Sequence, residues 1–341
     1  MKLSLTLFAA LCLSAPATEL VTSYQSETKL RVTISSETES EVTDFRLERN
    51  GEPIEGRGGG MGGGSEVTQT IVYVDEILAV ADGEPSELRR SFEELTRTSS
   101  NDDGEDQADA PLDGTTLLLS SEEGEVDVEL VDGSVDDDAL LEGHRMTLLL
   151  DAFLPEQEVE PGDSWSLEGE AVQQVLGLDM QSTYFPRPER EPDMERERGG
   201  RRGGGGRRRS GRQGRLLQQA DWSGTAKLLE GEEVVEGDAC RIIEIELTGS
   251  ASLEEESGGG RRGFAFGSSM PAPETTIEFE ITWKGRMAFS AEALRPVSLE
   301  LDGDYTSELE TERQRGDMTM TIYRLEEGSL SYQISIEDLN S

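Results

Sequence analysis

The sequence predicts a mainly β protein, an antiparallel meander that forms a curved sheet or a partly open barrel. One or two short helices and disordered Gly/Arg-rich and acidic loops are expected beside it. The main observation is the stretch 275–337, where apolar residues recur at every second position. Ile277, Phe279, Ile281 and Trp283 alternate with polar residues, which places four large apolar side chains on one face of a strand. Asn-Gly and Asp-Gly pairs, which favour tight hairpin turns, are the second observation.

The N-terminal part contains four strand candidates, at 29–35, 42–49, 67–80 and 86–97. Asn50-Gly51 marks a turn after the second candidate, and Asp82-Gly83 marks one after the third. The stretch 86–97 fits either a helix face or a strand. We favour the strand, because a turn directly after a long strand brings the chain back alongside it.

The middle of the chain adds strand candidates at 115–121 and 125–131. The best helix candidate is 136–153, where acidic residues crowd the start and leucines such as Leu140 and Leu148 supply an apolar face. Pro155 would end this helix.

In the C-terminal half, strands are expected at 240–247, 277–283, 297–301, 318–322 and 330–336. Asp302-Gly303 is predicted to form a tight hairpin turn after the run of Val297, Leu299 and Leu301.

The predicted organisation is a signal peptide at 1–17 followed by one β-rich domain at 18–341. Two halves, 18–165 and 166–341, are the alternative. Flexible insertions are expected at 57–65, 99–110, 187–215 and 257–270, because glycine-rich or acidic sequence buries too little to offset its backbone entropy.

Export is indicated by the first 17 residues, in which Lys2 precedes an apolar run and small residues. The protein is therefore expected in the periplasm or outside the cell. The mature chain is expected to have no transmembrane segment and no internal disulfide, since Cys240 is then its only cysteine. The net charge of −41 makes nucleic acid and anionic membranes improbable partners. Such an acidic, lysine-poor composition fits a protein of high-salt environments or a biased base composition.

The Leu154-Pro155 pair followed by Gly162-Asp163-Ser164-Trp165 resembles a segment of uncharacterised exported bacterial proteins with a β-rich second half. The resemblance extends loosely over 154–301. It implies no activity and no catalytic residue.

Residues for catalysis are scarce. His144 is the only histidine, so a nucleophilic triad would have to combine it with Cys240. The simpler interpretation is that the cysteine packs as a small apolar residue. No cofactor or metal site is predicted, and acidic clusters such as 102–106 and 132–138 are interpreted as solvated loops, with an irregular calcium site as the alternative. A carboxylate pair for glycoside hydrolysis has no local signature.

An arginine-rich tract at 199–215 is the one feature that suggests a contact site. It carries seven arginines and no acidic residue within a strongly acidic chain. Export and the lack of aromatic residues disfavour an RNA-binding role. We expect the tract to contact an acidic surface, either its own or a neighbouring copy's, or an extracellular polyanion. The contact residues would be Arg201, Arg202, Arg207, Arg208, Arg209, Arg212 and Arg215.

The leading functional hypothesis is therefore an exported, acidic, non-enzymatic binding or envelope-associated protein. The alternatives are a periplasmic carrier of lipid or another apolar ligand, and a carboxylate-dependent carbohydrate-active enzyme. A covering layer over the apolar strand face would favour a packing module, and an empty groove would favour a carrier. We favour packing for the residues that mark this face, which are Phe279, Trp283, Leu299, Ile322 and Ile334.

Overall fold

Long antiparallel strands make up most of the structure, a computed structural model that describes residues 17–54, 63–102, 104–176, 184–185, 216–256, 274–315 and 317–340. Seven strands have 17 to 21 residues each: β1 (Lys29–Arg49), β3 (Ser65–Ala81), β4 (Glu84–Asn101), β11 (Asp238–Glu256), β12 (Glu274–Ser290), β13 (Arg295–Arg315) and β14 (Met318–Asp338). The shorter strands are β2 (Glu52–Pro53), β5 (Gly104–Gln107), β6 (Thr116–Glu122), β7 (Glu125–Asp132), β8 (Ser164–Leu167), β9 (Asp221–Leu228) and β10 (Glu233–Val235).

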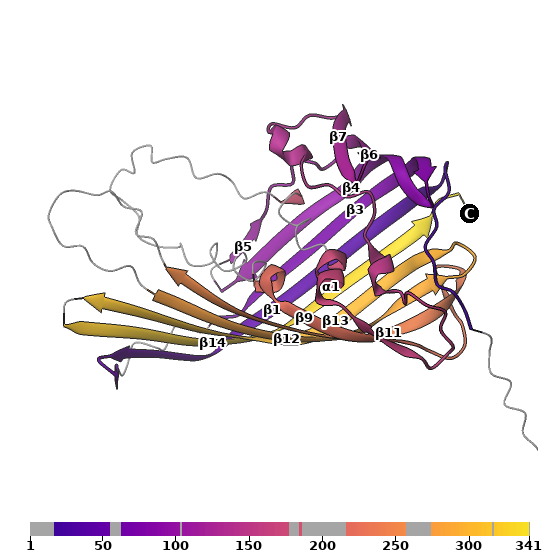
Figure 1. Ribbon diagram of the computed structural model, residues 1–341. Helices are drawn as coiled ribbons and strands as arrows, with labels where there is room; N and C mark the ends of the chain where they lie inside the picture. The colour runs from indigo at the N-terminus through magenta and orange to yellow at the C-terminus, as the bar shows by residue number, and fades with distance from the viewer. Residues whose placement is uncertain are drawn as a thin grey trace, which may run out of the picture.

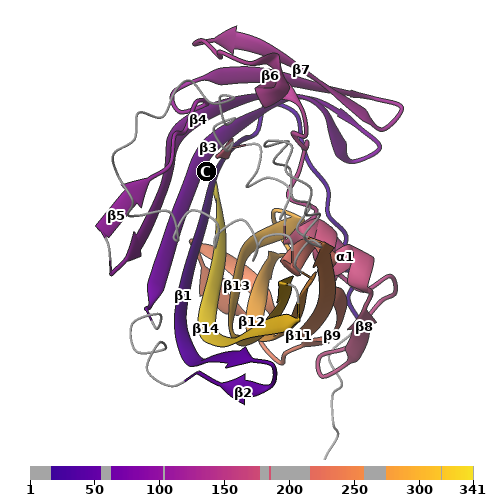
Figure 2. The ribbon, with the colours of Figure 1, turned by 90° about the vertical axis from the view of Figure 1, so that its left-hand side faces the viewer.

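All these strands belong to one sheet, with the order β7-β6-β4-β3-β1-β14-β13-β12-β11-β9-β8 along its main path. β7 and β8 are its two ends, so the described sheet is open and does not close into a barrel. Figure 1 shows the long strands side by side, and Figure 2 shows the curvature of the sheet, with α1 (Gly169–Val175) near β8 and β9. The predicted fold class is confirmed, and the curved open sheet is the alternative that the chain adopts.

The first and last long strands of the chain hold the two arms of the sheet together. β1 pairs with β14 from Leu30 opposite Asp338 to Arg49 opposite Met320, with one bulge at 42–44. The arm from β3 to β7 and the arm from β13 to β8 are joined through this pair.

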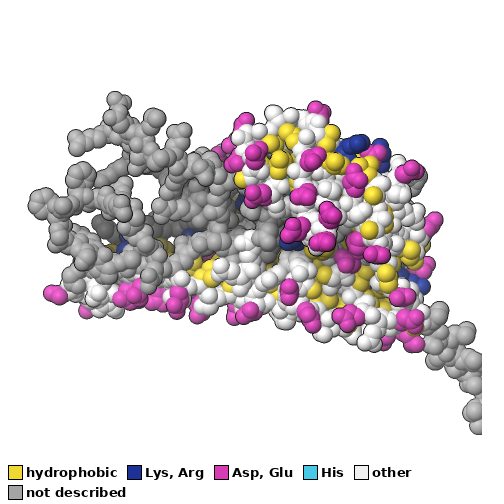
Figure 3. Space-filling view, turned by 45° about the horizontal axis from the view of Figure 1, so that its top comes forward, with side chains coloured by type: hydrophobic (Ala, Val, Ile, Leu, Met, Phe, Trp, Pro, Cys, Tyr) yellow, Lys and Arg dark blue, Asp and Glu magenta, His cyan; other side chains and the backbone are white. Residues whose placement is uncertain are grey.

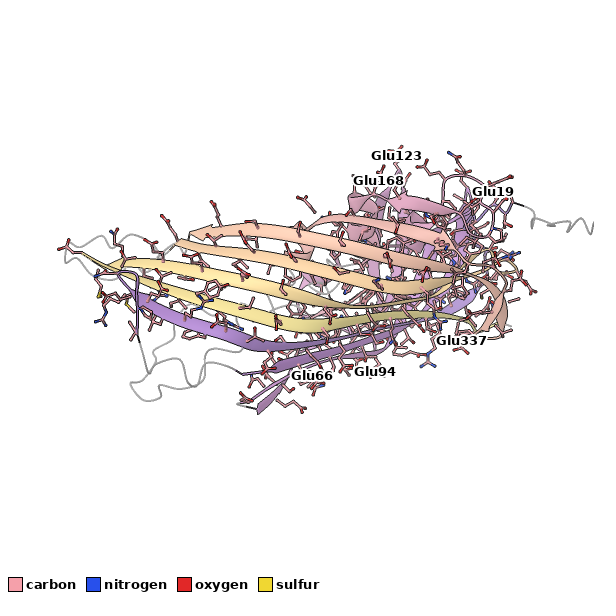
Figure 4. The ribbon with its side chains drawn as sticks, turned by 90° about the horizontal axis from the view of Figure 1, so that it is seen from below. Glu19, Glu66, Glu94, Glu123, Glu168 and Glu337 are labelled. Carbon is pink, nitrogen blue, oxygen red and sulfur yellow. The ribbon has the colours of Figure 1, made fainter. Side chains whose placement is uncertain are left out.

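The two faces of the sheet differ sharply in chemistry. On the inner face of β12, Ile277, Phe279 and Trp283 are at most 1% exposed, whereas Glu278 and Glu280 on the outer face are exposed. This alternation confirms the prediction for 277–283. Acidic side chains are spread over the described surface in Figure 3, and Figure 4 labels six of the glutamates.

Aromatic rings lie over glycines of the next strand at several places on the inner face. Trp283 is opposite Gly303, and Tyr305 is opposite Gly328. In both pairs a Cβ on the glycine would collide with the ring and with a backbone carbonyl. Trp222 lies in the same way against Gly249. Only glycine leaves room for these rings, so the rings lie close against the curved sheet.

Two of the predicted turns form, and one does not. Asn50-Gly51 and Asp82-Gly83 both have positive φ angles, as a tight hairpin turn of this kind requires. The predicted turn at Asp302-Gly303 is wrong, since both residues lie inside β13. Gly303 instead packs against the Trp283 ring on the neighbouring strand.

The predicted helix at 136–153 is also wrong as a continuous helix. Its ends form short 3-10 turns, η1 (Asp138–Leu141) and η2 (Leu150–Phe153). Between η1 and η2, Gly143 and Leu149 have left-handed φ angles, which a continuous right-handed helix does not contain. The hairpin interpretation of 86–97 is correct, because β4 returns alongside β3. β5 pairs with the end of β4, so much of 99–110 is strand instead of a loop.

Other expectations concern residues outside the described ranges. They concern residues 1–16 of the predicted signal peptide, residues 57–62 of the insertion at 57–65, and all of the insertions at 187–215 and 257–270. Within the described ranges, no helix is both long and apolar enough to cross a membrane.

We predict that Gly303→Ala destabilises the protein by about 2 kcal/mol or more, because the added methyl group collides with the Trp283 ring and the Thr282 carbonyl. Urea unfolding measures the change. Gly64→Ala is the matched control, since an added Cβ there meets only the Ser40 carbonyl, at 3.4 Å. Equal stability of Gly303→Ala and Gly64→Ala would contradict the claim that the Trp283 ring requires glycine at position 303.

Candidate functional site

The inner face of the sheet is the candidate site, and its two halves differ. η2, α1 and the segment 216–220 lie over one half, where Phe153, Val172 and Leu217 join the main core with the strand residues. Figure 1 shows α1 in front of the sheet, near the middle of the long strands. We call this the covered half.

Beyond the covered half, β12, β13 and β14 extend well past the described helices, to the left in Figure 1. The apolar pattern of the inner face continues there. Leu253 and Leu309 flank Ile277 in one cross-strand row, and Leu47 faces Ile322 in a neighbouring row. Ile277 is buried, whereas several others remain partly exposed. We call this set the distal inner face; its partly exposed apolar members are Phe45, Leu47, Leu253, Leu309 and Ile322.

The five residues that the sequence analysis used to mark this face therefore differ in how deeply they are buried. Phe279, Trp283, Leu299 and Ile334 are at most 2% exposed, so packing is correct for them. Ile322 is only partly buried.

One charged group lies on the distal inner face. Arg324 forms an ion pair with Glu326, two residues along β14. The hydroxyl of Tyr305 donates a hydrogen bond to Oε1 of Glu326 at 3.4 Å. These residues put hydrogen-bonding groups beside an otherwise apolar surface.

A second polar cluster is buried between β3 and β4. Arg90 and Asp75 face each other across these strands and form two hydrogen bonds of 2.8 and 2.7 Å. The guanidinium carbon also lies 4.2 Å from the ring centre of Tyr73. Burial raises the pKa of Asp75, and Arg90 opposes part of that shift.

His144 and Tyr184, which lie outside the strands, pack against Phe92 near this pair. The His144 ring lies 5.7 Å from the Tyr184 ring and 6.3 Å from the Phe92 ring, and its Nε2 hydrogen-bonds with the Leu140 carbonyl at 3.0 Å. Burial and then the charge of Arg90 lower the pKa of His144 to about 4. The histidine is therefore neutral near pH 7 and packs as part of the core.

Cys240 lies in a separate small apolar cluster with Ile242, Ala288 and Val297. Burial raises the pKa of its thiol, which is the opposite of what a nucleophile requires. His144 belongs to the cluster around Arg90, so the structure does not bring the two candidate catalytic residues into one site.

The seven arginines predicted as a contact site lie outside the described residues. Within the described ranges, no three His, Cys, Asp or Glu side chains gather as ligands for one metal ion. The buried pair of Asp75 and Arg90 was missed by the sequence analysis, since both residues look like ordinary charged positions of alternating strands.

No protein-family model and no curated protein sequence matches this chain. Among solved structures, a lipovitellin described under lipid-protein interactions has a TM-score of 0.29 at 6% identity, covering 89% of this chain. This chain spans only 25% of the lipovitellin chain. The InvG secretin domain of Salmonella has a TM-score of 0.14 at 8% identity, over 92% of this chain and 62% of that one. Both likenesses are too slight to carry an argument. The resemblance to exported bacterial proteins stays a prediction.

We predict that Arg90→Met destabilises the protein by about 3–5 kcal/mol, because it leaves the carboxylate of Asp75 buried without its partner. The double variant Arg90→Met/Asp75→Leu should recover much of this loss in urea unfolding. Arg89→Met is the matched control: Arg89 pairs with Glu76 at 3.0 Å on the same two strands but is exposed, so we expect a loss below about 1 kcal/mol. Equal losses in both single variants would contradict this account.

We also predict that His144 makes folding sensitive to acid. Its pKa is lowered in the fold from 6.5 to about 4, so the fold disfavours the protonated ring. The contribution is complete above pH 6.5 and is lost as the pH falls toward 4, by on the order of 3 kcal/mol in total. His144→Phe keeps a ring but cannot be protonated, and its stability should fall less over this pH range. Parallel pH profiles of the two proteins would refute the prediction.

Proposed function

We propose that the protein is an exported, non-catalytic binding protein that carries an apolar or amphiphilic ligand on its distal inner face. One observation carries the proposal. The apolar pattern of the inner face continues past the covered half, where side chains such as Leu253 and Leu309 are only partly buried.

The energetics favour a ligand there. Fully burying a leucine, isoleucine or phenylalanine is worth about 1.5–3 kcal/mol, so completing the burial of five such side chains offers several kcal/mol to an apolar partner. Ligand sites in proteins combine an apolar lining with a few polar groups that orient the ligand. The distal inner face has this composition.

The polar group indicates which kind of ligand suits the face. Tyr305, Arg324 and Glu326 offer donors and acceptors beside the apolar rows of β12 and β13. An amphiphile can direct its polar end to this group while its hydrocarbon part covers Leu309 and Leu253. This arrangement favours an amphiphile over a purely apolar molecule.

The absence of catalysis is inferred from the two reactive residues. His144 is buried and neutral near pH 7, and Cys240 is held as a thiol by burial. No observation on the described residues favours a carbohydrate-active enzyme. Export rests on the sequence of residues 1–17, and a place in the periplasm or at the cell envelope is part of the proposal.

We predict that native mass spectrometry of the protein purified from its own compartment reveals a bound amphiphile. Oleate, used as a defined probe in titrations, should bind the wild type. Leu253→Asn/Leu309→Asn should weaken oleate binding about tenfold, because each change removes apolar contact area worth a fraction of a full leucine.

The matched control is Val131→Asn/Val234→Asn, which also replaces two aliphatic side chains by asparagine, but at exposed residues of β7 and β10. Its affinity should equal that of the wild type. A clean apo mass together with no oleate binding would overturn the proposal, and so would equal loss of binding in both double variants.

A further inference from the structure

An ion pair interrupts an apolar row of the distal inner face. The row crosses five strands, and its members on β11, β12, β13, β14 and β1 lie opposite one another: Leu253, Ile277, Leu309, Arg324 and Phe45. Arg324 is the only charged member of this row. Its ion-pair partner Glu326 lies two residues further along β14, on the same face of the strand.

This ion pair does not hold two strands together. The buried pair of Arg90 and Asp75 joins β4 to β3, whereas Arg324 and Glu326 belong to one strand. Their side chains are only 16% and 21% exposed. Removing two charges from water is costly, and apolar residues of similar size are often at least as stable in such a place. The position of the pair therefore suits the binding of a ligand better than the stability of the sheet.

The pair presents both signs of charge side by side. Arg324 supplies guanidinium donors, and Glu326 supplies carboxylate acceptors. The hydroxyl of Tyr305 lies 3.4 Å from Oε1 of Glu326 and adds a third polar group. A ligand with a single negative charge is attracted by Arg324 but repelled by Glu326, and a ligand with a single positive charge meets the reverse. A ligand that carries both charges can pair with both residues.

We propose that the ligand of the distal inner face is a zwitterionic amphiphile. Its anion pairs with Arg324 and its cation pairs with Glu326, as the two charges of a phosphoethanolamine headgroup could do. This inference rests on the proposed function, because it names the ligand class of the same site.

The rest of the row accommodates the hydrocarbon part of such a ligand. From Arg324 the row continues across Leu309 and Ile277 to Leu253, three strand positions or about 14 Å away. Leu309 and Leu253 are partly exposed, so a hydrocarbon chain along the row completes their burial. The headgroup and the chain of one molecule therefore have adjacent sites on the same face.

Two probes with the same oleoyl chain separate the charge of the headgroup from the hydrocarbon contact. Lysophosphatidylethanolamine is zwitterionic, and lysophosphatidylglycerol carries only the negative charge. Isothermal titration calorimetry below the critical micelle concentration measures the affinity of each. Wild type should bind the zwitterionic probe at least about tenfold more tightly, because charge-assisted hydrogen bonds form at both ends of its headgroup.

The net charge of −41 also repels an anionic probe, so the decisive variant keeps that charge. R324Q/E326Q removes one charge of each sign, and its preference for the zwitterionic probe should fall about tenfold. E326Q alone should bind lysophosphatidylglycerol about tenfold more tightly than wild type does, because it removes the like charge beside the phosphate. Damage to the fold would not produce such a gain.

The matched control is D44N/R46Q, which removes an ion pair with the same two-residue spacing. Nη2 of Arg46 lies 2.6 Å from Oδ2 of Asp44 on β1, and both side chains are exposed on the outer face. This variant should keep the preference of wild type.

The outcomes separate the ligand class from the proposed function. If both probes bind but R324Q/E326Q keeps the preference of wild type, or E326Q gains no affinity for the anionic probe, the zwitterionic ligand is refuted and a carrier of amphiphiles still stands. If neither probe binds wild type, both proposals are refuted.

Discussion

The contact between an aromatic ring and a glycine on the neighbouring strand is the constraint on which the sheet depends. Trp283 lies against Gly303, and Tyr305 lies against Gly328 on the next strand along. Because glycine has no side chain, each ring can approach the backbone of the neighbouring strand closely on the inside of the curve. The sheet can therefore bend around its own core, while its ends at β7 and β8 remain apart.

The inner face of this curved sheet is divided into the covered half and the distal inner face. Where η2, α1 and residues 216–220 cover it, the face is an ordinary core, anchored on one side by the buried pair of Asp75 and Arg90. A buried ion pair contributes little net stability when complete but is costly to break, so it disfavours any shift of β4 relative to β3 that would separate Arg90 from Asp75. Past these elements the strands continue, and several of their inner side chains, such as Leu253 and Leu309, are only partly buried.

The sequence predicts the features that depend on neighbouring residues in the chain. Alternation at 277–283 and the positive φ angles of Asn50-Gly51 are local, and both predictions are confirmed. Asp302-Gly303 has the same local signal as a turn, but its role is decided by Trp283, which is nineteen or twenty positions away in sequence and directly opposite in the sheet. No local pattern contains that information. The helix predicted at 136–153 failed because apolar spacing does not reveal the left-handed residues that divide it.

The candidate sites were still less accessible to sequence reasoning. The inner face was recognised as apolar, yet which part of it is covered depends on a segment from the middle of the chain.

The most direct test of the central claim is amide hydrogen exchange of the protein with and without bound oleate. The account predicts added protection in the outer ends of β11, β12, β13 and β14, around Leu253, Leu309 and Ile322. Exchange in the covered half, around Phe153 and Val172, should stay unchanged. Protection confined to the covered half, or no change at the distal inner face, would contradict a ligand site on that part of the sheet.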